Sequence, residues 1–86
     1  MRDVFADFAR LQVRPDLGLS VLLGREDNDP GLAGLREREC IILVEPGELY
    51  AVGTAASVES GGHRYWYGIL ESMDAIQDGE PMASAR

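Results

Sequence analysis

The segment from Cys40 to Glu71 constrains the fold more than any other part of the chain, because it reads as three consecutive β-strands. Its apolar runs are separated by turn-forming residues at 45–48 and 60–62. Two successive glycines, Gly61 and Gly62, favour the type I′ turn that links short hairpins. The sequence therefore predicts strands at about 40–45, 48–59 and 63–71, with Glu59 facing Arg64 across the second hairpin.

Pro46 and Gly47 favour a type II turn, whose twist does not suit a two-residue hairpin. We expect a wider loop there, or a corner where the chain passes from one sheet to another. In the register set by the second hairpin, alternate residues of 49–70 form two faces. We expect the bulkier face to be the core: Tyr50, Val52, Thr54, Ala56, Val58, Tyr65, Tyr67 and Ile69.

The opposite face holds Trp66 among small residues such as Gly53, Ala55 and Gly68. A helix could pack closely against such a face, and residues 2–12 place apolar side chains at helical spacing. We therefore predict an N-terminal helix over 2–12 as the cover. Without that cover, Trp66 would form a partly exposed platform.

The remaining pattern predicts one more strand at about 17–23, a polar loop over 24–34 and a flexible tail over 79–86. Residues 1–78 then form a single small domain, mostly β. The expected architecture is a small SH3-like five-stranded barrel, or an antiparallel sheet with one N-terminal helix. The alternative is an α+β fold with a four-stranded antiparallel sheet and a helix on one face.

Composition narrows the class of protein. A chain of 86 residues can bury only a modest core, so it is expected to fold as one domain. Its single cysteine excludes an internal disulfide framework and a multi-cysteine zinc site. It has no apolar run of membrane-spanning length and no secretory signal pattern. We therefore expect a cytoplasmic protein that does not bind membranes.

The net charge is −7, and it is unevenly distributed. Residues 1–43 have eight acids and six arginines, a balance of −2, while residues 44–86 have seven acids and two arginines, a balance of −5. Such a field repels phosphates, so direct nucleic-acid binding is not expected. It would instead steer the protein toward a basic surface on a partner.

The residues that could carry chemistry form no catalytic or metal-binding pattern. Cys40 begins the most apolar strand, where a buried and inert thiol is expected, and His63 follows a hairpin tip, where an exposed turn residue is expected. Asp27, Asn28 and Asp29 do not continue into the ligand spacing of a calcium loop. Nucleotide-binding glycine motifs are missing. We expect no enzymatic activity and no cofactor or metal.

The leading hypothesis is a small acidic protein-binding module, a regulator or inhibitor that occupies a basic surface of a partner protein. In size and charge it is similar to phage-encoded inhibitors and immunity proteins, and it could mimic a nucleic acid. The predicted partner-binding residues are four rim carboxylates and one aromatic anchor: Glu45, Glu48, Glu59, Glu71 and Trp66. The alternative is an assembly subunit that forms a homo-oligomer through edge strands. The protein is expected to be a monomer or a homodimer.

Overall fold

The computed structural model describes residues 1–79, and they are mostly β-structure. The strands are β1 (Arg2–Phe5), β2 (Leu11–Arg14), β3 (Gly18–Arg25), β4 (Cys40–Glu45), β5 (Leu49–Ser60), β6 (His63–Ile69) and β7 (Gln77–Asp78). Three short 3₁₀ turns accompany them: η1 (Phe8–Arg10), η2 (Pro30–Leu32) and η3 (Met73–Ala75). Across residues 1–79, no helix has the length and apolar character that crossing a bilayer requires. The predicted tail lies outside the described residues, apart from Gly79.

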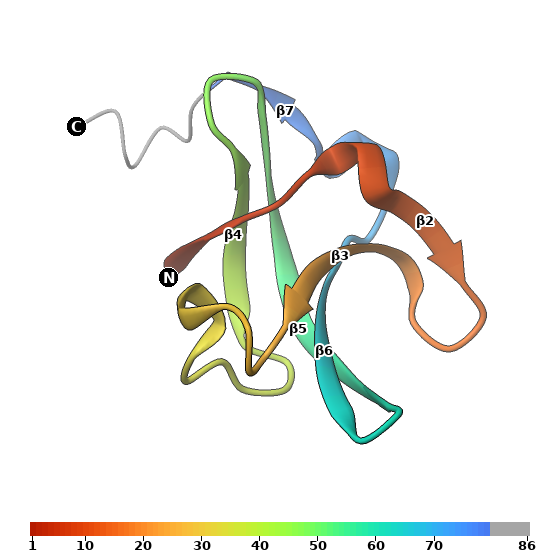
Figure 1. Cartoon of the computed structure of the whole chain (residues 1–86). Coiled ribbons are helices and arrows are strands. Elements are labelled where there is room, and N and C mark those ends of the chain that lie inside the picture. The colour runs from red at the N-terminus through yellow and green to blue at the C-terminus, as the bar shows by residue number, and fades with distance from the viewer. Residues whose placement is uncertain (80–86) are drawn as a thin grey trace.

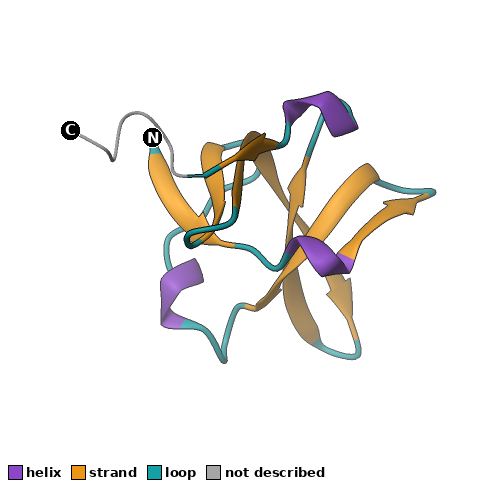
Figure 2. Ribbon diagram, turned by 90° about the horizontal axis from the view of Figure 1, so that it is seen from above, coloured by secondary structure: helices purple, strands orange, loops and turns teal. Residues whose placement is uncertain are grey.

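The strands form one open mixed sheet with the order β1-β4-β5-β6-β3-β2, and β7 pairs with β5 outside this path (Figure 1). The β1–β4 pair is parallel and the other pairs are antiparallel. The two edge strands, β1 and β2, are joined by residues 6–10, so the sheet curls strongly on itself (Figure 2). The structure therefore supports a mostly β fold. It supports neither the specific SH3-like five-stranded barrel nor the four-stranded alternative.

The predicted N-terminal helix is wrong, because residues 2–14 form β1, η1 and β2. Val4, Ala6 and Phe8 are buried, while Phe5 is 64% exposed, which is the alternation of a strand. The Ala6 N–H donates to the Val44 carbonyl at 2.9 Å, extending the pairing with β4. Val4, Ala6 and Phe8 belong to the same core cluster as Trp66, so this segment covers that side of the sheet with a strand and a 3₁₀ turn.

Two hairpins link the central strands β4, β5 and β6. Gly61 and Gly62 both have positive φ, and Glu59 pairs with Arg64 as the glycine turn predicts. At the other end of β5, the Glu48 N–H donates to the Glu45 carbonyl at 2.9 Å, and Gly47 has a φ of +74°. The link is thus a three-residue hairpin loop, wider than a two-residue turn as expected, and the alternative of a corner between two sheets is wrong.

The predicted core face is wrong, although the register that defines it is confirmed. The buried face of β5 and β6 is the one with small residues: Ala51, Gly53, Ala55, Trp66, Gly68 and Leu70. A Cβ added to Gly68 would lie 2.6 Å from a Leu43 methyl, and one added to Gly53 would lie 2.6 Å from the Ile69 carbonyl oxygen. The interior of this curled sheet is narrow, so small residues are needed there to admit Leu43 and Trp66.

Candidate protein-interaction surface

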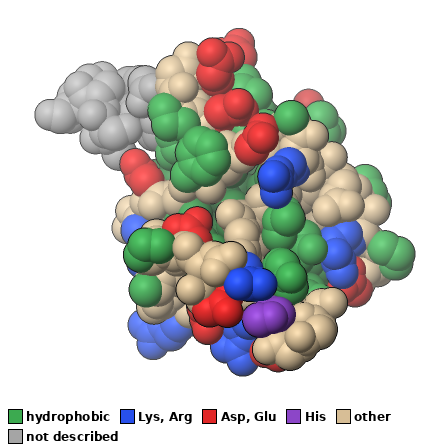
Figure 3. Space-filling model, viewed as in Figure 1, with side chains coloured by type: hydrophobic (Ala, Val, Ile, Leu, Met, Phe, Trp, Pro, Cys, Tyr) green, Lys and Arg blue, Asp and Glu red, His purple; other side chains and the backbone are tan. Residues whose placement is uncertain are grey.

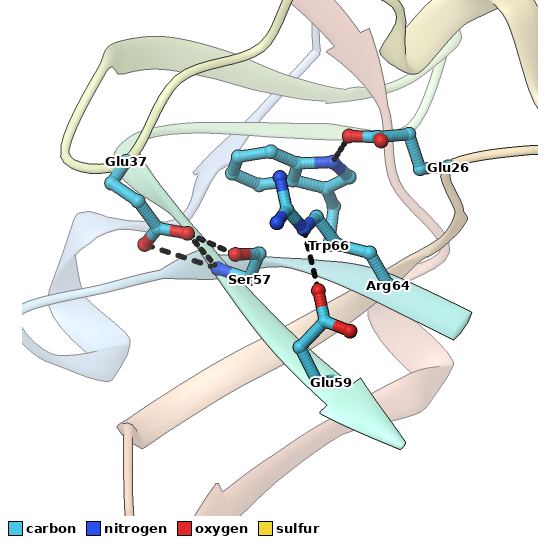
Figure 4. A network of polar contacts seen from close by, with 6 residues as sticks. All are labelled: Glu26, Glu37, Ser57, Glu59, Arg64 and Trp66. Carbon is cyan, nitrogen blue, oxygen red and sulfur yellow. Dashed lines mark hydrogen bonds and ion pairs between the residues drawn. The ribbon is translucent and has the colours of Figure 1, made fainter. Parts of the chain in front are cut away.

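Trp66 cannot serve as the predicted surface anchor. Its side chain is only 1% exposed and belongs to the core. The indole Nε1–H donates to Glu26 Oε1 at 2.8 Å, which satisfies the one polar atom of the ring (Figure 4). Trp66 is therefore a structural residue.

Glu59 lies at the β5–β6 hairpin, where charged groups pair with one another. Its carboxylate contacts the Arg64 guanidinium at 3.0 Å, and this hydrogen bond raises the pKa of Arg64. On the same strand, the Ser57 N–H donates to Glu37 at 3.0 Å, and the Ser57 hydroxyl also contacts that carboxylate (Figure 4). The carboxylates of this end are thus already engaged within the protein.

Asp27 is another carboxylate that is paired within the protein. It accepts a hydrogen bond from the Arg25 guanidinium at 2.6 Å and lies 3.4 Å from His63 Nδ1. Desolvation acts to raise the pKa of Asp27, but the hydrogen bond and charge of Arg25, with the nearby His63, outweigh it and leave the pKa below its ordinary value. His63 is half-buried beside the hairpin rather than an unengaged turn residue.

Glu45 has a structural role. Its half-buried carboxylate accepts a hydrogen bond from the Phe8 N–H at 3.3 Å, which ties the end of β4 to the first residue of η1. Glu45 is therefore less available to a partner than the exposed Glu48, two positions beyond Pro46 in the same turn.

Glu48 and Glu71 are exposed, and the structure adds Asp74 and Asp78 to them. Within residues 1–79, none of these four carboxylates forms a side-chain hydrogen bond or ion pair; we call them the acidic end. Asp78 reaches it because β7 pairs with the start of β5, opposite Leu49, and the Gly79 N–H donates to the Glu48 carbonyl at 2.8 Å. A two-residue strand leaves no periodic signal, so the sequence pattern could not place Asp78 beside Glu48.

The charges are therefore separated along β5. Leu49 and Glu59 are about ten residues apart on this strand, which corresponds to about 33 Å. In the space-filling view, acidic side chains gather at the upper end, near the β4–β5 turn and β7, while most visible arginines lie in the lower half (Figure 3). The four carboxylates that were predicted as one rim, Glu45, Glu48, Glu59 and Glu71, do not form a single cluster.

An apolar patch lies on the outer face of β1, β4, β5 and β6. Its residues are Phe5, Cys40, Ile42, Val44, Val52 and Ile69, and we call it the outer patch. The pairing places Phe5 beside Val44 and Ile42 beside Val52, so their side chains share one face. Val52 is 54% exposed. Apolar side chains gathered in this way make this face a candidate interaction surface.

The other half of the outer face is covered. Arg14 of β2 lies over the ring of Tyr67, 4.7 Å from its centroid, and donates a hydrogen bond to the tyrosine hydroxyl at 2.8 Å. Asp16 holds the same guanidinium through two hydrogen bonds. This cover explains why Tyr67 is 7% exposed although it lies on the outer face. The open part of the face is the part that lies over β4 and β5.

A groove of about 530 Å³ deepens one side of the outer patch. Its lining includes Cys40, Val52, Thr54, Ile69, Glu71 and Ala75. Cys40 is exposed rather than buried, because the first residue of β4 points to the outer face, beside Thr54. The prediction of a buried Cys40 is therefore wrong.

The remaining reactive groups are not brought together. Cys40 pairs with Thr54 and His63 with Ser60, so the two residues lie about 20 Å apart along β5. Among residues 1–79, no group of three or more histidine, cysteine or acidic side chains could hold a metal ion. Comparisons with protein-family models, curated proteins and solved structures find no match to this chain.

Proposed function

We propose that this protein is a non-enzymatic binding module, a regulator or inhibitor that occupies a basic surface of a partner protein. One observation carries the proposal: the acidic end, whose four carboxylates form no side-chain hydrogen bond or ion pair within residues 1–79, adjoins the open outer patch. Protein interfaces combine an apolar centre with a polar rim, and this surface offers both. The proposed partner-binding residues are Glu48, Glu71, Asp74 and Asp78 with Val52, and Glu45, Glu59 and Trp66 leave the predicted set because they have partners inside the protein.

The charge pattern supports this function because it favours an external partner. Elsewhere, carboxylates pair with arginines, as Asp16 does with Arg14 and Glu59 with Arg64. At the acidic end the like charges repel one another, and a basic surface would relieve that repulsion. Such complementarity accelerates association and makes it sensitive to salt. A partner that normally binds nucleic acid would present a suitable basic surface.

The test is affinity capture from the native host lysate at low salt, followed by elution with a salt step. We expect one basic protein to be released by salt. The double variant Glu48→Arg, Asp78→Arg should weaken its capture by about tenfold or more, since both rim charges are reversed.

The matched control is Glu59→Arg, compared with the single variant Glu48→Arg, because each reverses one charge at opposite ends of β5. It removes only an exposed ion pair, which contributes little to stability. Capture should therefore persist in Glu59→Arg. Equal loss in Glu48→Arg and Glu59→Arg, which change the net charge by the same amount, would show a dependence on net charge alone and would contradict the proposed surface.

The second candidate function, an assembly subunit, is favoured by the β2 edge of the sheet. Val13 is 77% exposed there, and β2 pairs only with β3 among the described residues. An open edge can pair with a copy of itself. Light scattering at low and high salt separates the two functions: a salt-resistant oligomer that Val13→Lys dissociates would support assembly, and a monomer would support the binding module.

A further inference from the structure

Building on the proposed function, we propose that the groove receives an apolar side chain of the partner, on a segment that also carries arginine or lysine. The groove is the hollow part of the outer patch, between β5, the end of β6 and η3. The partner segment must therefore present one large aliphatic or aromatic side chain with basic residues close to it in sequence.

The groove exists because β6 and β7 pair with different parts of β5. The β6 ladder ends with Ile69 opposite Thr54, and the β7 ladder begins with Gln77 opposite Tyr50. Between these pairs, residues 51–53 of β5 have no ladder partner on that side within residues 1–79. The connecting chain instead forms η3, whose Ala75 is one wall of the groove.

The lining of the groove favours an apolar occupant. Val52 and Ile69 supply branched aliphatic surface, and Val52 is more than half exposed. Covering such side chains removes apolar surface from water, which is the main favourable contribution to binding. The volume of about 530 Å³ falls within the range of ligand-binding clefts, so a large side chain can enter.

The positions of the carboxylates favour basic residues on either side of that apolar anchor. Glu71 lines the groove itself, and Asp74 lies beside Ala75 in η3. Glu48 is four positions before Val52, a separation of about 13 Å in extended chain. A partner segment that places one basic residue near the anchor and another about four positions away would therefore meet both groups of carboxylates.

The same charges argue against a second copy of this chain as the occupant. Two copies joined groove to groove would bring the two Glu71 carboxylates into one interface, and like charges in a desolvated interface are destabilising. Charge complementarity therefore selects a basic partner segment.

The experiment selects phage-displayed random dodecapeptides on the immobilised full-length protein. We expect the enriched sequences to share a large apolar residue with arginine or lysine within about four positions. The affinity of an enriched peptide, measured by fluorescence anisotropy, should fall by about tenfold or more for Val52→Asp. Val13→Asp is the matched control, because it changes an exposed valine outside the groove, and its affinity should stay within about twofold.

Cys40 provides a second measurement that needs no substitution. It is the only cysteine in the chain, it is exposed, and it lines the groove. A saturating amount of the enriched peptide should slow its alkylation by iodoacetamide by about tenfold or more, because the occupant covers the thiol. An unchanged alkylation rate would overturn the groove as the binding site even if Val52→Asp failed to fold.

The outcomes separate this inference from the proposed function. Enriched peptides that lack basic residues, or that bind Val52→Asp as tightly as the parent, would overturn the groove inference. If the charge reversal Glu48→Arg, Asp78→Arg abolishes capture of the native partner while Val52→Asp does not, the proposed function stands and the groove inference fails. If neither variant affects capture, both fail.

Discussion

The two faces of β5 differ in the size and the burial of their side chains. The inner face has small residues, Ala51, Gly53 and Ala55, and all three are buried. The outer face has larger ones, and Val52 is left more than half exposed. In a narrow, curled sheet, small side chains mark the interior because they make room for Leu43 and Trp66. Bulk alone is therefore a poor guide to which face of a small sheet is the core.

This difference also separates stability from function. Substitutions on the inner face should disturb packing and unfold the protein, while substitutions on the outer face should leave the fold intact and affect binding.

The largest expected effect is for Trp66→Ala. Because the indole is nearly fully buried and bonded to Glu26, its removal should lower the free energy of unfolding by about 3–5 kcal/mol. Urea denaturation monitored by circular dichroism measures the free energy of unfolding. A loss below about 1 kcal/mol would show that Trp66 is not a core residue. It would support the alternative that Trp66 forms a partly exposed platform.

The next effect is overpacking at Gly68. A Cβ at this position would meet the Leu43 methyl groups, so Gly68→Ala should cost about 1–3 kcal/mol of stability. Combining it with Leu43→Val should recover part of the loss in a double-mutant cycle, because the shorter side chain makes room. Simple additivity of the two changes would contradict this packing.

A matched pair of valines compares the faces directly. Val21 is fully buried, whereas Val52 is largely exposed. Changing valine to threonine preserves the shape but introduces a hydroxyl, so Val21→Thr should cost about 1–3 kcal/mol. Val52→Thr should change stability by less than about 0.5 kcal/mol. Equal losses in urea denaturation would contradict the assignment of inner and outer faces.

The smallest effect is on the pH dependence of stability. The hydrogen bond from Arg14 lowers the pKa of Asp16 below its ordinary value. Folding therefore favours the ionised carboxylate, and this contribution is present above the unfolded pKa of about 4. It is lost as the pH falls through the lower folded value. Asp16→Asn should reduce the change of the urea midpoint with pH below about pH 4. An unchanged profile would show that the Arg14–Asp16 pair contributes nothing to stability.

Local chemistry made part of the fold predictable from the sequence. Gly61 and Gly62 specify a hairpin turn, and the opposite charges of Glu59 and Arg64 favour the register that the structure has. The N-terminal segment was ambiguous, because Val4 and Phe8 fit a helical period and a strand period equally well. Its strand form depends on parallel pairing with β4, a long-range contact that local sequence does not encode.

The site was less predictable than the fold. Glu48 and Glu71 are exposed as expected, but their association with Asp74 and Asp78 depends on η3 and the two-residue β7. Trp66 was misplaced because a correct register still leaves open which face is covered. That choice is settled by the curvature of the whole sheet, which no single strand reveals.

The most direct test of the outer face as the binding surface is the affinity of the captured native partner for Val52→Asp compared with Val13→Asp. Both changes place a carboxylate at an exposed valine, one inside the groove and one on the β2 edge. We predict that Val52→Asp weakens binding by about tenfold or more while Val13→Asp binds like the parent. Equal affinities for the two variants would contradict a binding role for the outer face of β5.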